Sequence, residues 1–162
     1  MEQVIQHCKE MCVDRGYIIY DETPTIIQAT KPNGFRVYLC FIEQEKFNVE
    51  VVKYYYNLLR YDNIQHVIFI YKNQITPSVK KIIDGIQTMK IELFCQSAFY
   101  YNVTKHSLVP QHTRIEKEGH PEIDKYPSIR KTDPVARYYG YAVGDLIKIV
   151  RRDGSIYFRV VK

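Results

Sequence analysis

The residues of this chain that could do chemistry are few, and their spacing matches no common catalytic or metal-binding arrangement. Cys8 and Cys12 are four residues apart with His7 beside them, but no second pair at zinc-finger spacing follows. The three histidines of the C-terminal half are spaced as loop and surface histidines often are: His106, His112 and His120. We therefore expect no metal and no cofactor.

A nuclease site is the other chemistry to weigh, since acidic residues and a lysine near a strand can hold Mg²⁺ and position water. Glu43, Glu45 and Lys46 have this composition, but they lie in a polar turn that favours a solvated connection. A nuclease would instead show Mg²⁺-dependent cleavage that is lost on changing Glu50 or Lys53. The glycine-rich phosphate-binding motifs are absent. No catalytic residue is assigned, and we expect that the chain alone is not an enzyme.

The densest segment is KTDPVARYYGYAVGDLIKIVRR, residues 131–152. Asp133 and Pro134 predict a helix start, because Asp caps free N–H groups and Pro has the required φ. Gly140 predicts the end of that helix, and strands are expected at 146–150 and 156–161 around an Asp153-Gly154 hairpin turn. The arginines and tyrosines of this helix and hairpin predict a docking surface for a partner. The arginines can form forked bonds with carboxylates, and the tyrosines supply a large contact area: Arg137, Arg151, Arg152, Tyr138 and Tyr139. One of the two tyrosines is expected to cover the hairpin instead.

Elements that would position such a surface can be read along the rest of the chain. Residues 3–15 and 79–89 have the periodicity of amphipathic helices, and 52–60 is a further helix candidate. Strands are expected at 35–41, 47–52, 67–71 and 91–94, and a short extended piece at 106–112. Residues 116–127 read as a loop. Alternating strands and helices predict an α/β (α+β) fold. The pattern of apolar residues and expected elements changes near residue 104.

Charge is unevenly distributed over this expected fold. Residues 1–103 contain eleven basic and eleven acidic side chains, whereas residues 104–162 contain twelve and seven, which accounts for the whole net charge of +5. The excess favours an acidic partner, either nucleic acid or protein, or else a solubilising face. No apolar run is long enough for a membrane span, and the start of the chain shows no signal peptide. We expect no membrane association and reduced, buried thiols.

Several segments, taken in order, resemble one protein family. They are CVDRGYII (12–19), VIFIYKNQITPSVK (67–80), FYYNVTKHSLVPQH (99–112), DPVARYYG (133–140) and GDLIKIVRR (144–152). The chain resembles the fifth subunit shared by the eukaryotic nuclear RNA polymerases, and its C-terminal part resembles the small H subunit of archaeal RNA polymerase. The resemblance covers nearly the whole chain.

This resemblance implies a three-layer, nuclease-like but inactive jaw domain over residues 1–103 and a small mixed α/β assembly domain over 104–162. It implies a non-catalytic subunit of DNA-directed RNA polymerase that supports transcription, whose assembly domain docks on the largest subunit and contacts other subunits. General transcription factors are further expected partners, and a homo-oligomer is not expected. The remaining alternative is a stand-alone nucleic-acid-binding protein.

The resemblance also assigns residues to these two surfaces. Thr76, Pro77 and Ser78 match the jaw loop near downstream duplex DNA, and Lys80 and Lys81 beside them predict weak, sequence-independent phosphate contact. The signature of the assembly domain comprises the stretch from Asp133 to Gly140 and, before it, five residues: His106, Leu108, Val109, Pro110 and His112.

The chain departs from the family in being shorter. Residues 116–126 stand where the family has an extra helix, and the last loop is reduced to Arg152-Asp-Gly-Ser155. Such compression suggests a homologue from a large DNA virus. The expected location is the nucleus for a cellular protein, and the virion or the host cytoplasm, in viral factories, for a viral one.

Overall fold

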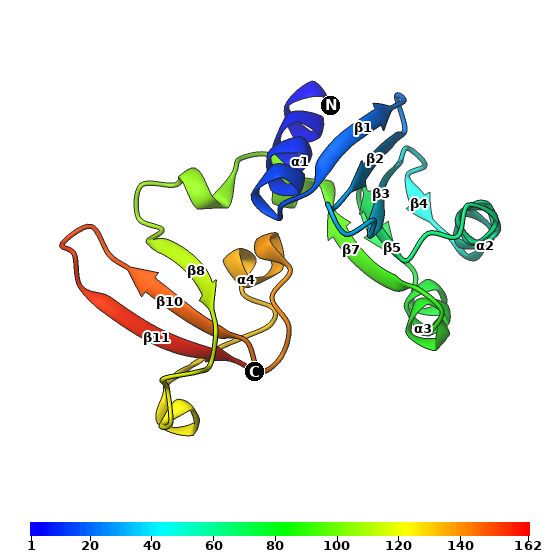
Figure 1. The fold of residues 1–162 in the computed structure, drawn as a ribbon. Coiled ribbons are helices and arrows are strands. Elements are labelled where there is room, and N and C mark those ends of the chain that lie inside the picture. Colours follow the sequence, from blue (N-terminus) through cyan, green and yellow to red (C-terminus); the bar gives the residue numbers. More distant parts are fainter. The chain divides into compact units, whose positions relative to one another are not determined.

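A five-stranded sheet is the frame of the N-terminal part of the chain (Figure 1). The computed structural model describes residues 1–162, which divide into two units, Met1–Tyr100 and Tyr101–Lys162. The sheet of the first unit has the order β1-β2-β3-β5-β7, in which β1, β2 and β3 are antiparallel and β3, β5 and β7 are parallel. Its strands are β1 (Ile18–Glu22), β2 (Ile26–Thr30), β3 (Arg36–Ile42), β5 (His66–Tyr71) and β7 (Lys90–Cys95). The expected α/β (α+β) class is confirmed.

Helices cover both faces of this sheet. Helix α1 (Glu2–Asp14) lies on one side, and α2 (Val49–Tyr61) and α3 (Pro77–Gly85) lie on the other (Figure 1). Strand β3 shows why both faces must be covered, because all its residues from Val37 to Ile42 are buried. Tyr38, Cys40 and Ile42 pack with residues of α2 and α3, and the alternating side chains therefore face the α1 side. None of the helices combines the length and the apolar run that crossing a bilayer requires.

The starts of α2 and α3 are fixed by capping side chains. Asn48 accepts a hydrogen bond from the Val51 N–H at 3.1 Å, and Thr76 accepts one from the Val79 N–H at 3.4 Å, with Pro77 in the first turn. The predicted strand 47–52 is therefore wrong, since only Lys46–Phe47 (β4) forms a strand before the helix begins. That short strand pairs in parallel with β6 (Gln74–Ile75). The helix predicted at 79–89 ends at Gly85, because Ile86 turns to an extended conformation.

The second unit is built on a four-stranded sheet of order β8-β10-β11-β9. Strand β10 (Leu146–Val150) pairs antiparallel with β8 (Gln111–Ile115) and with β11 (Ile156–Val161), and β9 (Ser128–Ile129) adds in parallel. The extended piece predicted at 106–112 is thus displaced, since the strand begins only after Pro110. Three short 3₁₀ helices complete the chain: η1 (Gln96–Phe99), η2 (Val103–Lys105) and η3 (Ile123–Lys125).

Helix α4 (Pro134–Tyr139) packs on one face of this second sheet. The Asp133 carboxylate accepts from the N–H groups of Val135 and Ala136, at 2.8 and 3.4 Å, and Gly140 ends the helix at φ 69°. A side chain at Gly140 would be strained, because L residues rarely adopt this left-handed conformation. Ala136, Tyr141, Ile147, Ile149 and Val161 form the core between helix and sheet. The predicted helix and hairpin are confirmed here.

Candidate partner-docking groove

A groove of about 380 Å³ opens beside α4 on the face of the second sheet that the helix partly covers. It brings together the segment before β8, the start of α4, and the hairpin formed by β10 and β11. Its lining residues are Leu108, Val109, Pro110, His112, Ile129, Asp133, Val135, Ile149, Arg151, Tyr157 and Arg159. We call the hollow lined by these residues the docking groove.

The floor of the docking groove follows from strand register. His112 of β8 pairs with Ile149 of β10, and Ile149 pairs with Tyr157 of β11, so the three side chains form one row across the sheet. Ile129, Val135 and Ile149 are buried and make the deep part apolar. Leu108, by contrast, is 83% exposed at the edge. The apolar floor and the exposed Leu108 beside it make this hollow a candidate contact surface for another molecule.

Charged groups line the rim of the docking groove. The Arg151 guanidinium lies over the Tyr157 ring, 4.3 Å from its centroid, and Arg159 Nη1 donates to the Ser128 carbonyl at 2.9 Å. Asp133 is occupied by the backbone N–H groups of α4. Pro110 O lies 2.8 Å from His112 Nδ1, a bond that orients the imidazole. The two arginines are therefore the cations that face an incoming group.

Six residues expected at the partner surface line this groove: Leu108, Val109, Pro110, His112, Asp133 and Arg151. His106, Pro134, Arg137, Tyr138, Tyr139 and Arg152 do not. Tyr138 is 4% exposed, and its hydroxyl accepts from Asn102 Nδ2 at 3.0 Å, so it belongs to the interior of the unit. Tyr139 stacks on Tyr141, with ring centroids 5.3 Å apart and planes 17° from parallel.

Sequence reasoning missed Ile129, Ile149, Tyr157 and Arg159 as lining residues. A usable signal was present for the last two, because a hairpin turn at Asp153-Gly154 puts alternate residues of the return strand on one face. Tyr157 and Arg159 are such a pair.

The predicted DNA-proximal turn has a simple local geometry. Thr76 caps α3, Pro77 and Ser78 are exposed in its first turn, and Lys80 and Lys81 are exposed further along the helix. A separate hollow in the first unit is lined by Lys46 and Lys72 among other residues, and Lys46 pairs with Gln74 across β4 and β6. Lys46 and Lys72, which are far apart in the sequence, therefore line the same hollow.

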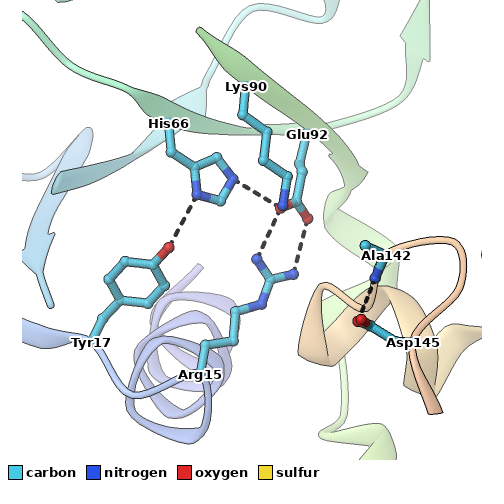
Figure 2. A network of polar contacts seen from close by, with 7 residues as sticks. All are labelled: Arg15, Tyr17, His66, Lys90, Glu92, Ala142 and Asp145. Carbon is cyan, nitrogen blue, oxygen red and sulfur yellow. Dashed lines mark hydrogen bonds and ion pairs between the residues drawn. The ribbon is translucent and has the colours of Figure 1, made fainter. Parts of the chain in front are cut away.

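A polar network, mostly buried except at Lys90, ties α1 to the sheet of the first unit (Figure 2). Arg15, just after α1, donates two hydrogen bonds to the Glu92 carboxylate, at 3.0 and 3.1 Å. His66 Nε2 lies 2.8 Å from Glu92 Oε1, and Tyr17 Oη lies 3.2 Å from His66 Nδ1. Lys90 completes the set at 3.0 Å from Glu92. We call these five residues the His66 network.

The protonation states of this network follow from burial and charge. Burial lowers the pKa of His66, and although the hydrogen bond to Glu92 opposes this, the imidazole stays neutral. Burial alone would raise the pKa of Glu92, but the hydrogen bond from His66 and the Arg15 charge outweigh it and hold that pKa well below its usual range. Burial raises the pKa of Tyr17 to about 12. Tyr17 is therefore no activated nucleophile, and the network ties elements together. No cluster of three or more His, Cys, Asp or Glu side chains is placed to hold a metal ion.

Residues 101–161, which include the whole docking groove, match the family model "RNA polymerase Rpb5, C-terminal domain". The second unit is therefore similar to the C-terminal domain of Rpb5. The resemblance that the sequence motifs indicated is thereby confirmed.

Two curated relatives extend the likeness beyond residues 101–161. The chain is 31% identical over 126 residues to a Dictyostelium discoideum protein named DNA-directed RNA polymerases I, II, and III subunit rpabc1, covering 71% of this chain and 64% of that protein. It is 30% identical over 125 residues to the Caenorhabditis briggsae protein named DNA-directed RNA polymerases I, II, and III subunit RPABC1, covering 72% and 59%. The matched part thus spans about three-fifths of each relative's length.

Proposed function

We propose that this chain is a non-catalytic subunit of a multisubunit DNA-directed RNA polymerase. The observation that carries the proposal is the match of residues 101–161 to the Rpb5 C-terminal domain model, with a docking groove formed from the same motifs that carry the resemblance. The two relatives are named as subunits shared by RNA polymerases I, II and III. Nucleotide addition is then the work of the large subunits, and this chain supplies no catalytic group.

In this proposal the second unit is the assembly domain, and the docking groove receives the largest subunit. The excess positive charge of residues 104–162 supports an acidic partner surface there. The exposed Leu108 supports a contact that buries it on assembly, because removing a leucine side chain from water is favourable by about 2 kcal/mol of free energy. Such a subunit works in the nucleus of a cell, or in the virion and cytoplasmic factories of a virus.

The first unit is proposed to be the jaw that lies near downstream duplex DNA. Its balanced charge supports only weak contact, which the exposed Lys80 and Lys81 beside Thr76–Ser78 would provide without reading sequence. Changing Pro77, Lys80 and Lys81 to alanine should reduce crosslinking of the assembled polymerase to downstream DNA. Unchanged crosslinking would contradict this part of the proposal.

The main test is affinity purification of the tagged chain from its native cells at moderate salt, followed by mass spectrometry. Both large polymerase subunits should be recovered in stoichiometric amount. Leu108→Asp should strongly reduce this recovery, because it places a charge against the apolar contact. Val143→Asp is the matched control, since Val143 is also exposed in the second unit but lies outside the groove, and it should change nothing. Recovery of the chain alone, or with nucleic acid, would overturn the proposal in favour of a stand-alone nucleic-acid-binding protein.

A further inference from the structure

We propose that the docking groove recognises an acidic peptide segment with one large apolar side chain, and that Arg151 and Arg159 bind its carboxylates. This inference rests on the proposed function, in which the second unit docks on another protein. It goes further by stating the chemistry of the segment and by naming Arg159 as a binding residue.

The two guanidinium groups are held in place before any partner arrives. Arg151 is stacked on the Tyr157 ring, and the bond from Arg159 to the Ser128 carbonyl restricts the second side chain. A guanidinium carries five N–H donors, and the bond to Ser128 uses one of them. Side chains already ordered lose less conformational entropy on binding, so both are suited to forked bonds with carboxylates.

The same groove offers a place for an apolar group. The buried side chains of Ile129, Val135 and Ile149 form its floor, and Leu108 stands exposed at its margin. A volume of about 380 Å³ is small for a folded element but sufficient for one large side chain with its neighbouring backbone. The groove therefore fits an anchor residue flanked by acidic ones.

A protein segment fits this surface better than nucleic acid. Duplex nucleic acid keeps its bases stacked inside, so its outer phosphodiester backbone has no large apolar group to place against Ile129, Val135 and Ile149. The Asp133 carboxylate, held by its hydrogen bonds to α4, repels any anion next to it, and a phosphate backbone carries a negative charge at every nucleotide, whereas a peptide can have acidic residues only opposite the arginines. A peptide can set its acidic residues against the arginines and its backbone N–H groups toward Asp133.

The direct test is binding of the full chain to short fluorescent peptides, measured by anisotropy. One peptide has a central phenylalanine flanked by aspartate and glutamate; a second has alanine at the centre, and a third has lysines in place of the acidic residues. The first should bind most tightly. Arg159→Gln and Arg151→Gln should each weaken it about tenfold, the usual consequence of losing a charge-assisted pair. Arg159→Lys should recover part of the loss.

The control variant is Arg152→Gln, because Arg152 is exposed beside Arg151 in the hairpin but does not line the groove. Its affinity should equal that of the unchanged chain. Equal losses in Arg151→Gln and Arg152→Gln would mean that only net charge matters, and would overturn the inference. So would failure of all peptides to bind, or tighter binding of a DNA oligonucleotide through the same two arginines.

A second readout separates this inference from the proposed function. The tagged chain with both Arg151→Gln and Arg159→Gln should recover much less of the large polymerase subunits from native cells than the Arg152→Gln chain does. Undiminished recovery would leave the polymerase assignment standing and reject the role of the arginines. Binding of the acidic peptide by a chain that never recovers polymerase would reject the assignment and retain the groove chemistry.

Discussion

Glu92 is the residue on which the His66 network depends. Its carboxylate accepts from Arg15 and His66 and lies beside Lys90. Glu92→Gln removes the negative charge from beside Arg15, whose side chain is 4% exposed. The free energy of unfolding of the first unit should fall by about 3 kcal/mol, because breaking a buried ion pair leaves the other charge poorly compensated. Urea unfolding measures it.

The control for this change is Glu22→Gln, which removes the exposed pair between Glu22 and Lys9 in the same unit. Ion pairs of that kind contribute about 0.5 kcal/mol. If both variants lowered the free energy of unfolding equally, the network would have no special role.

The same network predicts how stability depends on pH. The folded-state pKa values of His66 and Glu92 are both lowered. As the pH falls, the unfolded chain therefore binds more protons than the folded chain does. The first unit should therefore lose stability below about pH 6.5, through His66, and again below about pH 4.5, through Glu92. Urea unfolding at stepped pH values measures this, and His66→Gln should flatten the upper step. A stability that rose on acidification to pH 5 would contradict it.

At the groove, residues within one contiguous motif could be predicted, and residues joined only by strand register could not. Leu108, Val109, Pro110 and His112 stand together in the sequence. Arg159 reaches the same groove because β11 folds back on β10, and a one-residue slip would turn its side chain to the opposite face. Tyr138 and Tyr139 are adjacent, and burial of the first depends on helical phase rather than composition.

Helix α2 shows how one side chain sets the position at which an element begins. Asn48 has an extended backbone, and its carboxamide oxygen accepts from the Val51 N–H, so the helix begins at Val49. Asn48→Ala should lower the free energy of unfolding of the first unit by about 1 kcal/mol, because an N–H at the start of the helix loses its partner. Asn48→Asp should retain most of this stabilisation, because aspartate can also accept the hydrogen bond from the Val51 N–H. Urea unfolding of the two variants makes the comparison, and equal stability of Asn48→Ala and the unchanged chain would show that the cap is dispensable.

Elements with local chemical signals were predictable. Thr76-Pro77, Asp133-Pro134 with Gly140, and Asp153-Gly154 each specify their own helix start, helix end or turn. The segment after Phe47 was misassigned because its valines and tyrosines suit a strand as well as a helix, and the tertiary contacts of α2 decide between them. The early end of α3 at Gly85 follows from the weak helix preference of glycine.

Across the whole molecule, the fold class could be predicted but the strand order could not. Alternating helical and extended periodicity indicates layers, whereas the order β1-β2-β3-β5-β7 depends on packing between segments far apart in the chain. The two units also differ in charge, since the excess lies in residues 104–162. If the first unit is the DNA-proximal jaw proposed above, its balanced charge predicts only weak attraction to DNA.

The four cysteines of this molecule offer a way to observe it in its working surroundings. Cys8, Cys12 and Cys40 are buried, and burial raises their pKa values, that of Cys12 to about 12. Cys95, at the end of β7, is only partly buried. Iodoacetamide should therefore alkylate Cys95 first in the folded chain, because a thiolate must form and be reached. Peptide mapping by mass spectrometry checks this, and labelling of Cys8 at the same rate would contradict it. A dye attached there would make Cys95 a fluorescent reporter of the first unit, without any engineered residue, as the chain meets its partners.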